Sequence, residues 1–118
     1  MTKFFRGFLF AAHGLLYTFR TQINFRVEVF AALAVIGLSC YLGLDTSEWL
    51  WISLAITLVL TCELANTAIE TLVDLVSPDF NPKAGIIKDI FAALVLISAI
   101  FALIIAILIL LPKILYAP

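Results

Sequence analysis

The chain has 118 residues, of which 64 % are hydrophobic and 13 % are charged, whereas soluble domains average about 45–50 % and about 25 %. This composition and a mean hydropathy of +1.19 exclude a soluble enzyme, a disordered tail and a disulfide-stabilised scaffold. The net charge of −1 gives no reason to expect nucleic acid as a partner. We therefore expect one membrane-embedded domain over residues 1–118.

The first segment, residues 2–21, predicts an amphipathic helix on the membrane surface. Its basic start and apolar run are similar to a signal peptide, but His13 and Gly14 interrupt the run and no cleavage site of small residues follows. At about 100° per residue, the basic and polar side chains share one face, opposite a face of phenylalanine, leucine and alanine. Phe10 is the exception, because it projects among the polar side chains. We expect this helix to lie on the cytoplasmic leaflet.

Three apolar stretches predict three transmembrane helices, at about residues 25–44, 48–76 and 82–112. A turn between the first two contains Asp45 and Ser47, either of which can cap the second helix. The third helix is expected to begin with Asn81 as its N-cap and Pro82 in its first turn. No alternation typical of strands is present, so the fold class is an all-α membrane protein.

The distribution of basic residues predicts the topology. Lys3, Arg6, Arg20 and Arg26 precede the first span, and Lys83 and Lys88 follow the second. Because basic residues gather on the cytoplasmic side, the N-terminus and the second loop are expected to be cytoplasmic and the C-terminus external.

The second span ends in a row of polar residues. Glu63, Asn66, Glu70 and Asp74 have helical offsets that place them within about 60° of arc, and Glu63 is expected about 9 Å inside the cytoplasmic membrane boundary. We call these four residues the acidic ladder. A purely structural interpretation is that Asn66 and a protonated Glu63 hydrogen-bond to other helices. In an antiparallel hairpin, Lys88 and Asp89 would lie opposite the ladder.

The residue types of the ladder favour phosphoryl transfer to a lipid. Carboxylates at an interface suit Mg²⁺, which binds one or two acids together with substrate phosphates. A carboxylate in apolar surroundings is suited to act as a general base, and Lys88 near a helix start can hold phosphate. At this depth the phosphoryl acceptor that the carboxylate can reach is the headgroup hydroxyl of a lipid. No nucleotide-binding or catalytic motif of the soluble kinases is present.

The segments ELANTAIETLVD, KDIFAALVLI and NFRVEVFAALAV resemble the small integral-membrane diacylglycerol kinases and undecaprenol kinases of bacteria. The resemblance covers nearly the whole chain. It implies a surface helix and three spans in the bacterial inner membrane. It also implies a homotrimer whose active sites are shared between subunits, with ATP and Mg²⁺ as the phosphoryl donor system.

The resemblance also implies roles for individual residues. Glu63 corresponds to the catalytic base and Asn66 to its polar neighbour. The nucleotide-binding positions are Phe10, Gln22, Glu70, Asp79, Phe80, Asn81, Lys88 and Asp89, with Glu70 and Gln22 as the metal ligands. The lipid-substrate positions are Asn24, Glu28, Glu63 and Ala92. Gln22 stands where members commonly have glutamate, so either the metal binds more weakly or another acid, such as Glu28, contributes.

Three functions remain open from the sequence. Glu28 after Phe25 and Arg26 is similar to the diacylglycerol kinases, whereas Asn24 before Phe25 is similar to the undecaprenol kinases. We take diacylglycerol as the expected substrate and undecaprenol as the alternative. A more remote alternative is a non-enzymatic oligomeric membrane subunit or cation channel lined by acids. Lys88 and Asp89 argue against a channel, because a pore needs no phosphate site.

Overall fold

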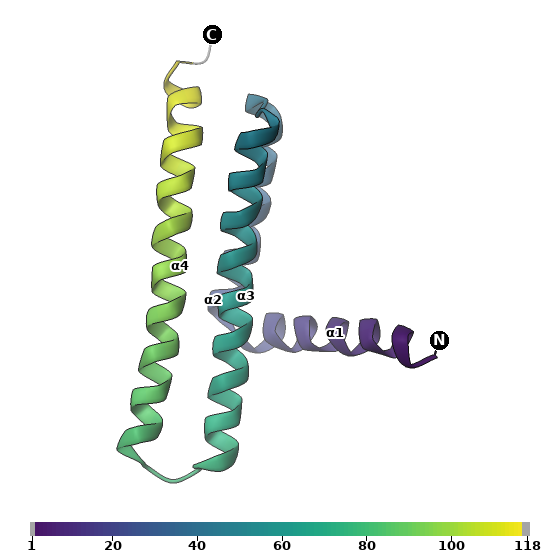
Figure 1. The fold of residues 1–118 in the computed structure, drawn as a ribbon, viewed down its shortest axis with the longest axis vertical. Helices are drawn as coiled ribbons and strands as arrows, with labels where there is room; N and C mark the ends of the chain where they lie inside the picture. The colour runs from purple at the N-terminus through teal and green to yellow at the C-terminus, as the bar shows by residue number, and fades with distance from the viewer. Residues whose placement is uncertain (1, 117–118) are drawn as a thin grey trace.

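The computed structural model describes residues 2–116 and consists of four helices. These are α1 (Thr2–Thr21), α2 (Ile23–Leu42), α3 (Thr46–Val76) and α4 (Pro82–Leu115). Figure 1 shows α2, α3 and α4 running side by side, while α1 leaves the bundle sideways. The predicted all-α class is confirmed, as is the presence of three helices long and apolar enough to cross a membrane.

The helices begin at residues that satisfy their free backbone amides. The Asp45 carboxylate accepts from the Glu48 amide at 2.9 Å, and the Glu48 carboxylate accepts from the Asp45 amide at 3.0 Å. Of the two expected caps for α3, Asp45 is therefore the one used, and Ser47 lies inside the helix. At α4, Asn81 accepts from the Lys83 amide at 3.0 Å, followed by Pro82 in the first turn, as predicted. Local sequence thus determines both starts.

The corner between α1 and α2 is held by Arg26. Its guanidinium Nη1 donates to the carbonyls of Phe19 and Arg20, at 2.8 and 2.9 Å. These carbonyls belong to the last turn of α1, where helices leave acceptors unpaired and carry partial negative charge. The Arg26 guanidinium of α2 therefore caps the C-terminal end of α1. Gln22 alone separates the two helices.

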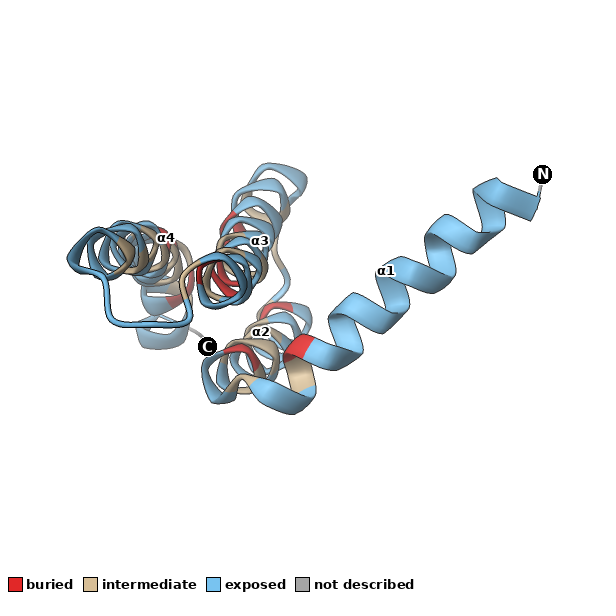
Figure 2. Cartoon of the chain, turned by 90° about the horizontal axis from the view of Figure 1, so that it is seen from below, coloured by how far each residue is buried: buried red, intermediate tan, exposed pale blue. Residues whose placement is uncertain are grey.

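The α3–α4 hairpin is tied at both ends. Its buried apolar cluster consists of Ile52, Ala55, Ile105 and Leu110. Near the α2–α3 turn, Lys113 Nζ lies 3.2 Å from Glu48 Oε1, and near the α3–α4 loop Lys88 Nζ lies 2.7 Å from Asp74 Oδ1. Most of the remaining helix surface is exposed (Figure 2), and it carries many large apolar side chains. Such a surface suits lipid or another protein chain better than water.

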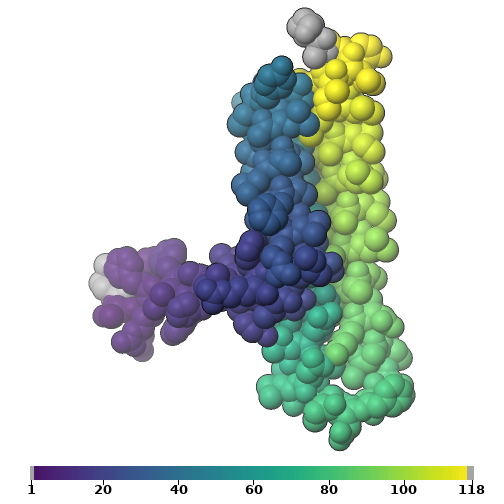
Figure 3. Space-filling view, turned by 180° about the vertical axis from the view of Figure 1, so that it is seen from behind, coloured from purple at the N-terminus to yellow at the C-terminus, as the bar shows by residue number. Residues whose placement is uncertain are grey.

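The helices differ in length, and this sets where the polar residues lie. α2 has 20 residues and α3 has 31, so α3 extends roughly 16 Å further at about 1.5 Å per residue. Figure 3, seen from behind, shows α1 leaving the bundle partway along its long axis. The C-terminal part of α3, the α3–α4 loop and the start of α4 extend past the level of α1. Glu70 and Asp74, the ladder residues nearest the α3–α4 loop, lie on this extension of α3.

Candidate active site

Burial decreases along the acidic ladder toward the α3–α4 loop. Glu63 is 1 % exposed and Asn66 is 8 % exposed, Glu70 is half-buried, and Asp74 is exposed. The gradient arises because Glu63 faces α2, whereas Asp74 lies on the extension of α3 beyond the start of α2. The ladder therefore joins a buried carboxylate to an accessible one along one helix.

Two buried oxygen atoms of the ladder have no hydrogen-bond partner among the described residues. These are Glu63 Oε2 and Asn66 Oδ1. The Asn66 amide group donates to Glu70 Oε1 at 3.4 Å, which orients the oxygen of Asn66 away from Glu70. Buried acceptors left without a donor cost free energy, about 1–3 kcal/mol each and more when charged. The site is thus suited to receive a donor such as a hydroxyl group.

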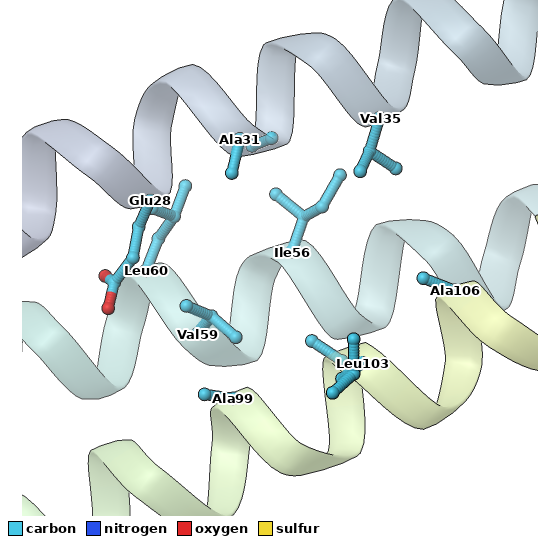
Figure 4. A pocket seen from close by; sticks show the side chains of 11 residues that line it. Glu28, Ala31, Val35, Ile56, Val59, Leu60, Ala99, Leu103 and Ala106 are labelled. Atoms are coloured by element: carbon cyan, nitrogen blue, oxygen red, sulfur yellow. The ribbon is translucent and has the colours of Figure 1, made fainter.

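Glu28 of α2 is a third buried acceptor at this level. Its Oε2 has no partner within residues 2–116, and its charge interacts with that of Glu63 across the α2–α3 contact. Glu28 also stands at one end of a groove of about 270 Å³ between α2, α3 and α4 (Figure 4). The rest of this groove is lined by apolar side chains: Ala31, Ala32, Val35, Ile56, Val59, Leu60, Ala99, Ala102, Leu103 and Ala106. The groove is therefore apolar along its length and has a carboxylate at one end.

Lys88 lies opposite the ladder, as the antiparallel hairpin predicts. It is in the second turn of α4 and forms its ion pair with Asp74, and the charge of Glu70 also acts on it. Asp89, the next residue, is exposed. The structure thus brings Glu63, Asn66, Glu70 and Lys88 to one side of the hairpin.

The other predicted nucleotide and metal positions are not gathered with these residues in one chain. Phe10 is 66 % exposed on α1, the helix that leaves the bundle (Figure 1). Gln22 lies at the α1–α2 corner, where its side chain donates to Thr21 at 3.5 Å. The loop positions Asp79, Phe80 and Asn81 are exposed at the far end of the hairpin. Within residues 2–116, moreover, no three His, Cys, Asp or Glu side chains cluster as a metal site.

The predicted lipid positions divide in the same way. Glu28 and Glu63 lie close together, whereas Asn24 and Ala92 are exposed on α2 and α4. Sequence reasoning also missed Arg26 as the anchor of α1, since it counted this residue only as a basic charge. A second missed feature is a cleft between α1 and α3, lined among others by Gly14, Thr18 and Thr67. Small and hydroxyl residues on the facing helices were the available signal.

Comparison with known proteins gives consistent matches over most of the chain. The family model described as prokaryotic diacylglycerol kinase matches residues 9–110. An undecaprenol kinase of Bacillus subtilis is 39 % identical over 113 residues, covering 96 % of this chain and 92 % of that protein. A diacylglycerol kinase of Synechocystis is 40 % identical over 110 residues; the match covers 92 % of this chain but 63 % of the relative. The Escherichia coli K12 diacylglycerol kinase is 29 % identical over 103 residues, 87 % of this chain and 84 % of that protein.

Proposed function

The chain belongs to the prokaryotic diacylglycerol kinase family, and from this premise we propose that it transfers the γ-phosphoryl group of ATP to the hydroxyl of diacylglycerol. It is a lipid kinase, a transferase that acts on an alcohol group. Family membership removes the reason to consider a non-enzymatic subunit or a cation channel.

The observation that carries the proposal is the buried Glu63 carboxylate. Its Oε2 has no hydrogen-bond partner among residues 2–116, and its charge interacts with that of Glu28 in the second turn of α2. A lipid hydroxyl that reaches this level can donate to Glu63. A positioned carboxylate that takes a proton in the transition state accelerates such reactions by about 10²–10⁴-fold.

In the proposed reaction, Glu63 accepts the hydroxyl proton while the lipid oxygen forms a bond to the γ-phosphorus. The bond between that phosphorus and the bridging oxygen breaks, and ADP leaves with the electron pair. Asn66, whose amide group donates to Glu70, lies about one helical turn from the base, and its oxygen has no partner within residues 2–116. Protonated Glu63 then releases its proton to water.

Nucleotide binding is assigned to Glu70 on α3 and to the start of α4 with the loop before it. Lys88 is the proposed phosphate ligand, with Asp89 and the loop residues Asp79, Phe80 and Asn81 nearby in sequence. Glu70 fits Mg²⁺, since this ion binds proteins through one or two carboxylates plus substrate phosphates. Gln22 would add a neutral oxygen ligand. When bound, Mg²⁺ supplies positive charge that offsets the charge on the phosphates.

We further propose a homotrimer whose active sites combine residues from neighbouring chains. The support is the separation of Phe10 and Gln22 from the α3–α4 loop within one chain, together with the exposed apolar surfaces of the helices. In chains placed side by side, α1 of one chain can lie against the α3–α4 hairpin of another, above the loop.

The proposed placement is the bacterial inner membrane, with α1 on the cytoplasmic leaflet as an amphipathic helix. The bundle crosses the bilayer from this level to the α2–α3 turn. The 20 residues of α2 match the length of about 20 residues that a bilayer core requires. The extension of α3 and α4 then reaches into the cytosol, where ATP is available.

Undecaprenol is the second candidate substrate, because an undecaprenol kinase aligns with nearly the full length of both chains. The test uses purified protein in detergent with radiolabelled ATP, offered diacylglycerol and undecaprenol in separate reactions. The labelled products of the two reactions are compared, and we expect a higher kcat/KM for diacylglycerol than for undecaprenol. Preferential labelling of undecaprenol would replace the diacylglycerol proposal, and no labelled lipid in either reaction would contradict the kinase function.

A further inference from the structure

We propose that Asp74 competes with the nucleotide for Lys88, so that ATP must displace an internal carboxylate to reach its phosphate ligand. This inference rests on the proposed function, in which Lys88 holds a phosphate group. Asp74 itself is not among the residues that the proposed reaction uses. Its role is that of a positioning residue, which acts through Lys88.

The geometry of the pair is direct. Lys88 Nζ lies 2.7 Å from Asp74 Oδ1, and the two residues are 14 positions apart in the sequence, on either side of the α3–α4 loop. Among residues 2–116 the other ion pair joins Lys113 to Glu48 at the opposite end of the hairpin. Asp74 is therefore the anion that holds the Lys88 ammonium when nucleotide is absent.

The pair is also accessible to a competing anion. The Lys88 and Asp74 side chains are 38 % and 68 % exposed. Exposed ion pairs are weak and are screened by salt; their strength amounts to a factor of at most about five in an equilibrium constant. A polyphosphate offers Lys88 a higher charge and several oxygen acceptors, so exchange of Asp74 for phosphate is favourable.

The competition reduces the apparent affinity for nucleotide to the intrinsic affinity multiplied by the fraction of Lys88 that is free of Asp74. Replacing the carboxylate with an amide of the same shape frees Lys88. We therefore expect Asp74→Asn to lower the Kd and KM for MgATP by about 2- to 5-fold, while kcat stays unchanged. Because the pair is exposed, the gain should shrink at high ionic strength.

The experiment measures the Kd of a fluorescent MgATP analogue, at low and high salt, alongside KM and kcat. Helical content and thermal unfolding in detergent verify that each variant is folded. Lys113→Gln is the matched control, since it breaks the other ion pair of the same hairpin and should leave the Kd unchanged. In the Lys88→Gln background, adding Asp74→Asn should also leave the Kd unchanged.

Two results would overturn the inference. An unchanged or raised Kd in Asp74→Asn means that Asp74 does not compete with nucleotide. An equal gain in the Lys88→Gln background means that Asp74 acts by general charge repulsion rather than through Lys88. The nucleotide-binding measurement needs no lipid substrate, so it decides this inference even if lipid phosphorylation by the wild-type protein fails.

Discussion

Glu63 and Glu70 lie seven residues apart on α3 but in different surroundings. Glu63 is buried with an unpartnered oxygen, whereas Glu70 is half-buried and accepts a hydrogen bond from Asn66. The same type of side chain is therefore suited to two tasks. The buried carboxylate can take a proton from a lipid hydroxyl, and the more accessible one can face nucleotide and metal.

Replacing each carboxylate should consequently impair activity in a different way. Glu63→Gln keeps the shape but removes the basicity, so we expect kcat to fall by about 10²–10⁴-fold with little change in MgATP affinity. Glu70→Gln should weaken MgATP binding as well as turnover. Steady-state kinetics and nucleotide titration of both variants provide the measurement. Near-normal lipid phosphorylation by Glu63→Gln would contradict its assignment as the base.

Gln22 offers a gain-of-function prediction at the same scale. If its side chain is a metal ligand, Gln22→Glu adds a negative charge beside a hard cation and should raise Mg²⁺ affinity. We expect half-maximal activity at a lower Mg²⁺ concentration. Gln22→Asn, which shortens the side chain without adding charge, is the control. If the glutamate variant and the wild type give the same Mg²⁺ titration, Gln22 does not bind the metal.

Among the elements, α1 depends on α2 for its direction. The Arg26 guanidinium donates to two carbonyls in the last turn of α1, and hydrogen bonds to a charged group contribute about 1.5–3 kcal/mol each. The last turn of α1 is thus fixed by a side chain from the first turn of α2.

Loss of this anchor should loosen α1 relative to the bundle. We expect Arg26→Gln to broaden the distance distribution between spin labels at the exposed positions His13 and Leu75, measured by pulsed electron paramagnetic resonance. Arg26→Lys should restore the distribution in part, because a charge remains near the carbonyls. Arg20→Gln removes the same charge while keeping the carbonyl acceptor. If it broadens the distribution equally, net charge and not the Arg26 contact controls α1.

Sequence reasoning succeeded where neighbouring residues determine the structure. The caps at Asp45 and Asn81 depend on amides within three residues, and the ladder follows from helical spacing along α3. The position of Lys88 opposite the ladder required one further assumption, an antiparallel hairpin, whereas its ion pair with Asp74 was not predicted. These features are local or nearly so.

The remaining features depend on how distant elements meet. The two bonds of Arg26 exist because the chain turns at Gln22, and no residue pattern specifies that angle. Likewise, the burial of Glu28 beside Glu63 requires the rotation of α2 against α3, which an almost uniformly apolar helix does not reveal. The separation of Phe10 from the loop 77–81 is equally a property of the assembled chain.

For the whole molecule, the topology can be tested directly. Thr46 and Asn81 lie at opposite ends of α3, so single cysteines there should react with a membrane-impermeant maleimide from opposite sides. The native Cys40 and Cys62 are first replaced by alanine. By the positive-inside rule, Asn81→Cys should be labelled only from the cytoplasmic side and Thr46→Cys only from outside. Labelling of both positions from the same side would exclude a membrane-crossing α3.

The two ion pairs of the α3–α4 hairpin also fix the register of these helices. Glu48 and Asp74 are 26 residues apart on α3, and Lys88 and Lys113 are 25 residues apart on α4. Because the two spacings differ by only one residue, sliding α4 along α3 by one turn, about 5.4 Å, would break both pairs together. If nucleotide draws Lys88 away from Asp74, the register at that moment depends chiefly on the apolar cluster of Ile52, Ala55, Ile105 and Leu110, with the Lys113–Glu48 pair as a minor contribution. Packing near the α2–α3 turn would then keep α3 and α4 in register at the other end of the hairpin, where Lys88 and the ladder lie, during each turnover.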